Sequence, residues 1–199
     1  MDVTVYESAS TLKPLGAGLM LAGNAMKAFQ ALHIDNEILG AGKKLKVLKV
    51  KTDQGKTLSE TNAETIAQKY GITNTFSIHR ADLHRVLVNH IPSQALQLGK
   101  GCTNFEQHAT GITLYFTDHT HAEADFVIAC DGIHSIFRKK LIPASKTRYA
   151  GYTCWRAVIN NPDKDINMDE TSETWGKKGR VGIVPLSQNR IYWFACVNA

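Results

Sequence analysis

The chain has 199 residues, of which 43% are hydrophobic and 21% are charged, a composition typical of a folded globular protein with one domain, or one domain and a smaller lobe. No apolar run is long enough for a membrane-spanning helix, and the N-terminus lacks the layout of a signal peptide. The formal net charge of +5 is not accompanied by a nucleic-acid-binding motif, and four scattered cysteines without a C-x-x-C pair predict reduced thiols in the cytoplasm.

The first predicted element is a short alternating strand over residues 2–6 that ends at Glu7. In dinucleotide-binding sheets a carboxylate at the end of the second strand holds the adenosine ribose, and a G-x-G-x-x-G turn precedes it by about 20 residues. Only six residues precede Glu7, and the sequence contains no G-x-G-x-x-G. Either the acidic strand end is accidental, or this is a nucleotide-binding protein without its first strand and glycine-rich turn.

Helical and strand-like patterns alternate along the rest of the chain. The predicted helices lie over residues 24–32, 63–69, 80–91 and 133–141. The predicted strands of the first part lie over residues 46–51, 56–59, 75–78, 102–107, 112–117 and 125–129. Lysines within residues 43–51 indicate the solvated face or the edge of a sheet. After Pro143 the composition shifts, and the strand-like segments 149–159, 171–175, 180–185 and 190–197 predict an antiparallel sheet rich in aromatic residues.

The most specific stretch covers residues 125–138, where an apolar strand ends in Asp131-Gly132 and Ser135 stands near a helix start. A glycine there lets a ligand approach the backbone, and the aspartate accepts hydrogen bonds from ribose or ribityl hydroxyls. The same pattern also fits an ordinary strand–turn–helix connection, because Asp-Gly is a common turn.

With three other stretches, this segment resembles the flavin-dependent aromatic hydroxylases, the single-component flavoprotein monooxygenases. Residues 3–7 are similar to their second strand, residues 16–32 to their flavin-side loop and helix, and residues 77–83 to a junction whose arginine contacts FAD. Residues 151–156 are similar to the start of the substrate sheet in the salicylate-hydroxylase-like branch. The family's glycine-rich turn and its later Gly-Asp motif are absent, so the chain resembles the middle half of such an enzyme.

The resemblance implies an α/β fold, with a partial FAD-binding Rossmann-like lobe over residues 1–147 and an antiparallel-sheet substrate lobe over 148–199. The cofactor-binding residues that it implies are Glu7, Ala17, Gly18, Arg80, Cys102, Asp131 and Gly132. Arg180 and Tyr192 are expected to contact a small aromatic substrate. The implied reaction is hydroxylation with FAD as cofactor, NAD(P)H as reductant and dioxygen, and it requires no protein nucleophile.

Two alternatives remain open from the sequence. One is another flavoenzyme of the same fold, halogenase-like or reductase-like, and the other is a non-catalytic fragment that self-associates without cofactor. The missing first strand and turn predict weak FAD binding by this chain and self-association through uncovered apolar surface. No metal site is expected, because His119 and His121 share a polar turn without a third ligand nearby.

Overall fold

The structure is a computed structural model that describes residues 1–71, 75–161 and 166–199. The chain forms two compact units: unit 1 contains Met1–Lys13 and Ile91–Ala150, and unit 2 contains Pro14–His90 and Gly151–Ala199. The lobes expected from the sequence are each continuous, so they do not coincide with these units. The expected roles of residues 1–147 and 148–199 in cofactor and substrate binding stay predictions.

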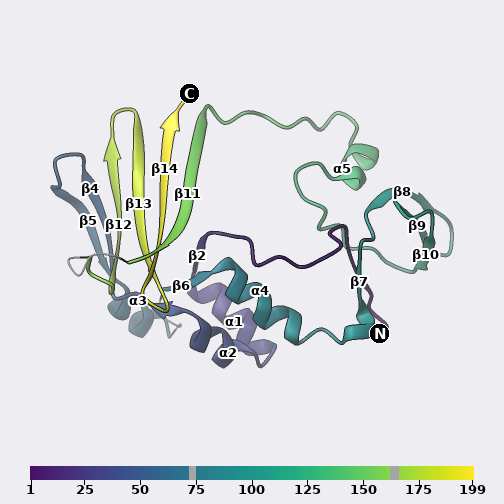
Figure 1. Cartoon of the computed structure of the whole chain (residues 1–199), viewed down its shortest axis with the longest axis horizontal. Helices are drawn as coiled ribbons and strands as arrows, with labels where there is room; N and C mark the ends of the chain where they lie inside the picture. Colours follow the sequence, from purple (N-terminus) through teal and green to yellow (C-terminus); the bar gives the residue numbers. More distant parts are fainter. Residues whose placement is uncertain (72–74, 162–165) are drawn as a thin grey trace. The chain divides into compact units, whose positions relative to one another are not determined.

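Unit 1 contains two small sheets and one short helix (Figure 1). The strand β1 (Val5–Glu7) pairs in parallel with β7 (Leu96–Leu98), which follows a 3-10 turn over Ser93–Ala95. The second sheet has the order β10-β9-β8. Its strands and the helix are β8 (Cys102–Gln107), β9 (Ile112–Phe116), β10 (His121–Ala124) and α5 (Ile136–Leu141). The core lies where the Phe137 ring stacks on Phe105, with ring centroids 4.5 Å apart.

The prediction of a strand over residues 125–129 is wrong. In the described part of the chain no strand pairs with this segment, and the side chains of Phe126 and Ile128 are 88% and 89% exposed. A continuous apolar run such as residues 126–129 forms a strand only where a neighbouring strand satisfies its backbone groups. The following helix begins at Ile136 instead of 133, because the Ser135 hydroxyl caps it by accepting a hydrogen bond from the Arg138 backbone N–H.

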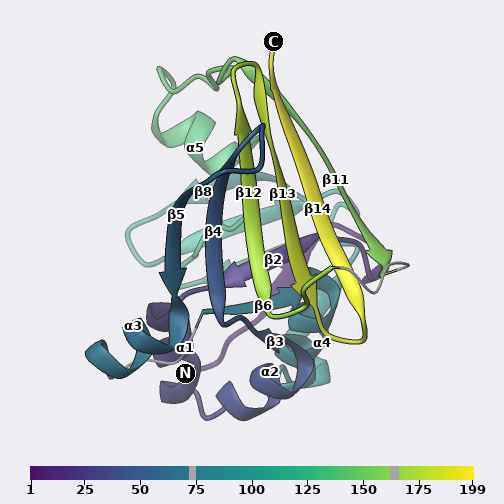
Figure 2. The ribbon, with the colours of Figure 1, turned by 90° about the vertical axis from the view of Figure 1, so that its left-hand side faces the viewer.

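Unit 2 is built on a six-stranded mixed sheet with the order β11-β14-β13-β12-β4-β5 (Figure 2). The strands are β4 (Val47–Thr52), β5 (Thr57–Asn62), β11 (Tyr152–Asn160), β12 (Glu170–Gly176), β13 (Gly179–Leu186) and β14 (Arg190–Asn198). The pair β4–β12 is parallel, whereas the others are antiparallel. The mixed α/β fold class is confirmed, but the early hairpin joins the sheet that was expected to contain only later strands.

The pairing of β4 with β12 explains the lysines of the early hairpin. The ammonium groups of Lys49 and Lys51 lie 2.7 and 2.9 Å from the Glu170 carboxylate. Burial raises the pKa of Glu170, but the hydrogen bonds from the two lysines outweigh it and hold this pKa below its usual value. The lysines were expected on the solvated face or at the edge of a sheet, and for β4 the edge position is wrong, because β5 is the edge of this sheet.

Four helices and a small sheet lie at one end of the six-stranded sheet (Figures 1 and 2). The helices are α1 (Gly23–Ala31), α2 (Asp35–Ala41), α3 (Ala63–Tyr70) and α4 (Arg80–Asn89). The small sheet has the order β2 (Gly18–Leu21), β6 (Phe76–His79) and β3 (Lys43–Lys44). The core residues between them are Met26, Ile34, Ile38, Phe76, Ile78 and Val86.

Two polar contacts fix this helical end of unit 2 to the large sheet. The buried Ser77 hydroxyl of β6 donates a hydrogen bond of 2.5 Å to the Pro185 carbonyl of β13. Asp82 of α4 accepts a hydrogen bond of 2.6 Å from Arg190 at the start of β14. The start of α4, and with it Arg80, therefore has a defined position relative to β13 and β14.

Candidate functional site

In unit 2 the loop before β2 is attached to the first turn of α4. The Arg80 backbone N–H donates to the Ala17 carbonyl, and its guanidinium Nη1 donates to the Leu15 carbonyl, both at 2.9 Å. A Cβ atom at Gly16 would lie 2.7 Å from the Arg80 Cβ, so only glycine allows the loop to approach this closely. The structure thus brings the predicted cofactor residues Ala17 and Arg80 together.

Gly18 follows this loop as the first residue of β2, and it is buried. A Cβ atom there would lie 2.5 Å from three atoms of the Tyr192 side chain. A residue predicted to bind cofactor is therefore packed against a residue predicted to bind substrate. The sequence showed no sign of this contact, because Gly18 and Tyr192 belong to elements that are far apart in the chain.

Arg180 and Tyr192 lie on the same face of the large sheet. Arg180 of β13 is opposite Cys196 of β14, and Tyr192 stands four residues before Cys196 on that strand. Side chains two or four residues apart on a strand point to the same side. The two predicted substrate residues therefore share one surface, but a separation of four residues along β14 places them about 13 Å apart.

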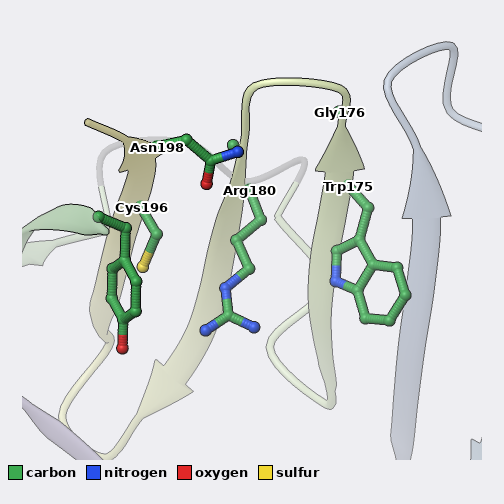
Figure 3. Close-up of a pocket in the computed structure, with 7 residues that line it drawn as sticks. Trp175, Gly176, Arg180, Cys196 and Asn198 are labelled. Atoms are coloured by element: carbon green, nitrogen blue, oxygen red, sulfur yellow. The ribbon is translucent and has the colours of Figure 1, made fainter. Parts of the chain in front are cut away.

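An open pocket of about 350 Å³ surrounds Arg180 on this face (Figure 3). In Figure 3 the Arg180 side chain lies between Trp175 and Cys196, which come from the neighbouring strands β12 and β14. The lining residues are Tyr152, Trp175, Gly176, Gly179, Arg180, Cys196 and Asn198. The pocket therefore combines one guanidinium group with aromatic walls.

The surroundings of Arg180 and Tyr192 shift the pKa values of both predicted substrate residues. A hydrogen bond with Cys196 and the charge of Glu173 raise the pKa of Arg180, so its guanidinium stays protonated. Its Nη1 lies 3.2 Å from Glu173 Oε1, but this contact lacks hydrogen-bond geometry, and Oε1 accepts no hydrogen bond from any described residue. Burial raises the pKa of the Tyr192 phenol, and the positive charge of Arg156 offsets part of this rise.

Unit 1 holds the other predicted cofactor residues. Glu7 ends β1, and its Oε1 accepts hydrogen bonds from the Ala9 backbone N–H at 2.7 Å and the Ser8 hydroxyl at 3.1 Å. The Lys100 N–H donates to the Glu7 carbonyl at 2.9 Å, which places Cys102, at the start of β8, near the same strand end. Burial raises the pKa of the Cys102 thiol, so the thiol is protonated at neutral pH.

Asp131 and Gly132 lie in the exposed turn before α5. The Asp131 Oδ2 accepts a hydrogen bond of 2.9 Å from the Ile136 backbone N–H, so this carboxylate is already used to support the helix start. Gly132 has a φ of +80°, and no heavy atom lies within 4 Å of the place that a Cβ would occupy. Asp131 therefore has a structural role at the start of α5, and Gly132 leaves space for an approaching ligand.

Two other kinds of site receive no support from the described residues. Among them, no group of three or more His, Cys, Asp or Glu side chains is arranged to hold a metal ion. Within residues 1–71, 75–161 and 166–199, no helix is long and apolar enough to cross a membrane.

The strand-end carboxylate, the close loop against α4 and the adjoining mixed sheet are features of a nucleotide-binding α/β protein. A family model described as FAD binding domain matches residues 1–198, and the chain belongs to this family of FAD-binding proteins. The recognised resemblance to flavin-dependent aromatic hydroxylases is confirmed, because the relatives of the chain are FAD-dependent aromatic monooxygenases.

The chain is 30% identical over 195 residues to an aurachin C monooxygenase/isomerase from Stigmatella aurantiaca, with 98% of this chain and 50% of that protein covered. It is 28% identical over 196 residues to an FAD-dependent urate hydroxylase from Klebsiella pneumoniae, covering 98% and 51%. Klebsiella pneumoniae HpxO complexed with FAD and uric acid has a similar structure, with a TM-score of 0.84, 26% identity and coverage of 97% and 49%. The chain spans about half the length of the curated relatives it matches.

Proposed function

We propose that the protein that contains this chain hydroxylates a small aromatic compound, with FAD as cofactor, NAD(P)H as reductant and dioxygen as co-substrate. The family match and the monooxygenase and hydroxylase names of the relatives support this activity. The observation that carries the proposal is the packing of Gly18, in the predicted flavin loop, against Tyr192 on the sheet face that also bears Arg180.

The described residues fit FAD in three places. The Glu7 Oε2 atom makes no hydrogen bond within the described residues, so it is available to a ribose hydroxyl. The Arg80 side chain is exposed next to a loop closely packed on α4, and a guanidinium suits an anionic pyrophosphate. Gly132 leaves open space beside the Asp131 turn. When bound, FAD supplies the oxygen-transfer chemistry, and the protein supplies binding and orientation.

The sheet face is proposed to hold the substrate. A protonated Arg180 is suited to pair with a carboxylate or to stabilise an oxyanion, and the Tyr192 phenol is suited to hydrogen-bond a ring hydroxyl. The half-exposed rings of Tyr152 and Trp175 provide apolar walls for an aromatic ring. These groups bind and orient, and none of them acts as a nucleophile in the proposed reaction.

We also propose a cytoplasmic location and self-association of the isolated chain. All four cysteines are free thiols, which suits a reducing compartment. The exposed side chains of Phe126 and Ile128 are apolar surface of the kind that favours association.

Flavin retention tests the cofactor assignment. In the complete protein that contains this chain, we expect Arg80→Ala to weaken FAD binding about tenfold to a hundredfold, the loss of one charge-assisted hydrogen bond of about 1.5–3 kcal/mol. His119→Ala, in the turn after β9, is the matched control and is expected to keep wild-type affinity. The measurement is titration of FAD followed by flavin fluorescence. Equal affinities in the two variants would refute the role of Arg80, and a wild-type protein without affinity for FAD would favour the non-catalytic alternative.

Substrate dependence tests the proposed activity. In the FAD-loaded protein, aromatic acids are expected to stimulate NAD(P)H oxidation, with one oxygen atom incorporated into the ring. Arg180→Gln removes the charge but keeps polar donors, so we expect the KM to rise at least tenfold with FAD content unchanged. Stimulation without oxygen incorporation would favour a reductase-like flavoenzyme. Loss of FAD in the Arg180 variant would refute its assignment to substrate.

A further inference from the structure

Two cysteines that the proposed function does not use lie directly opposite each other in the large sheet of unit 2. Cys154 of β11 pairs with Cys196 of β14 in an antiparallel register. Opposite residues in such a pair direct their side chains to the same face. The two thiols are therefore neighbours, although 41 residues separate them in the sequence.

The hydrogen bonds at the two ends of this strand pair determine the geometry between the cysteines. The Ala199 N–H donates to the Gly151 carbonyl at 3.0 Å, and the Asn161 N–H donates to the Asn189 carbonyl at 2.8 Å. Hydrogen-bonded and non-hydrogen-bonded pairs alternate along an antiparallel ladder. Cys154–Cys196 is an odd number of steps from both of these hydrogen-bonded pairs, so it is a non-hydrogen-bonded pair.

A non-hydrogen-bonded pair brings opposite residues closest together. Its Cα atoms are about 4.5 Å apart, and this separation lies within the range of about 4.4–6.8 Å that a disulfide spans. The pair can therefore be joined without moving the backbone, whereas an arbitrary pair of surface cysteines cannot.

The two thiols differ in accessibility. Cys154 is exposed on the sheet face, whereas Cys196 is buried beside Arg180. Burial and the neighbouring Cys196 raise the pKa of the Cys154 thiol, and the charges of Arg156 and Arg180 partly oppose this rise. An incoming reagent therefore meets Cys154 first, and Cys196 is placed behind it.

We propose that Cys154 and Cys196 form a dithiol site that closes to an intramolecular disulfide by exchange with a low-molecular-weight disulfide. The Cys154 thiolate attacks one sulfur of the reagent, which forms a mixed disulfide and releases one thiol after protonation. The Cys196 thiolate then attacks the Cys154 sulfur, and the second half of the reagent leaves as a thiol. The protein loses two protons and two electrons, and the reagent gains both.

The disulfide would join β11 to β14 at the wall of the Arg180 pocket. Cys196 lies opposite Arg180 in the strand register and lines the same pocket, so its oxidation changes the surroundings of that guanidinium. Oxidation of this dithiol site therefore changes the wall of the Arg180 pocket, whatever ligand the pocket binds.

The test treats the whole chain with oxidised glutathione and counts thiols after unfolding. Of the four free thiols, those of Cys154 and Cys196 are expected to disappear without glutathione retained on either residue. Trypsin, which cleaves after Arg148, Arg156 and Arg190, should then release residues 149–156 linked to residues 191–199, and a reductant should separate these peptides. Linkage between other cysteines, or glutathione that stays on Cys154, would overturn the proposal.

Two variants complete the test. Cys196→Ser is expected to leave glutathione on Cys154 as a stable mixed disulfide, because the resolving thiol is gone. Cys130→Ser is the control, since Cys130 is exposed like Cys154 but lies in unit 1, and it should give the linked peptides in wild-type yield. Linked peptides that form only between two chains, seen as a covalent dimer, would contradict the intramolecular pairing.

Discussion

Replacement of Phe76 by alanine is expected to lower the free energy of unfolding by about 3–5 kcal/mol, the usual cost of removing a buried aromatic ring from a core. Phe76 is 0% exposed, and it packs with Met26, Ile38 and Val86 in the core of unit 2. Its backbone pairs with β2 on one side and β3 on the other, so the surrounding elements have little freedom to close the cavity. Urea denaturation followed by tryptophan fluorescence measures the change.

Leu58→Ala is the matched control for this prediction. Leu58 lies on the edge strand β5 and is 56% exposed, so its replacement should change the free energy of unfolding by no more than about 0.5 kcal/mol. Equal losses in the two variants would show that the cluster around Phe76 is not the core that stabilises unit 2.

Gly18→Ala is expected to destabilise the protein by about 1–3 kcal/mol, and to weaken FAD binding as well if the loop before β2 contacts the cofactor. The added methyl group would lie 2.5 Å from the Tyr192 Cβ and ring, and β2 is held by its pairing with β6. The strand must therefore shift, and the loop attached to Arg80 shifts with it. Denaturation midpoints and FAD titration measure the two effects separately.

Replacement of Tyr192 provides a control for the Gly18→Ala prediction. If the clash with Tyr192 is the cause, Tyr192→Ala should suppress most of the Gly18→Ala effect in the double variant, so that the two changes are strongly non-additive. Gly40→Ala is the second control: this helical glycine has no heavy atom within 4 Å of a Cβ position, so alanine should stabilise α2 by about 0.5–1 kcal/mol. Additive effects of Gly18→Ala and Tyr192→Ala would refute the contact.

Local sequence patterns predicted many of the individual elements. The helix α4 was found because Leu83, Val86 and Leu87 recur at helical spacing, and the short helix α3 was also predicted. In the structure the Asn62 side chain caps α3, and Gly71 ends it in the left-handed conformation. The helix α2 was missed because its seven residues give too few turns for a recognisable period.

Long-range pairing could not be predicted in the same way. Nothing local to Val47–Thr52 indicates that this strand pairs with Glu170–Trp175, and the division into two continuous lobes failed to anticipate it. The apolar run at residues 126–129 led to the opposite error, the prediction of a strand that does not form, because such a run forms a strand only beside a pairing strand. Most individual site residues were proposed from motifs, but the contacts Gly18–Tyr192 and Cys154–Cys196 depend on tertiary packing and on register.

The parallel pairing of β4 with β12 also has a consequence for the order of folding. The ammonium of Lys49 and the carboxylate of Glu170 are 121 residues apart in the sequence, so this pair closes a long loop and makes the topology slow to form. At a synthesis rate of roughly 5–20 residues per second, the β4–β5 hairpin leaves the ribosome several seconds before β12 exists. During that interval one edge of the hairpin lacks its partner strand and is open to pairing with other strands.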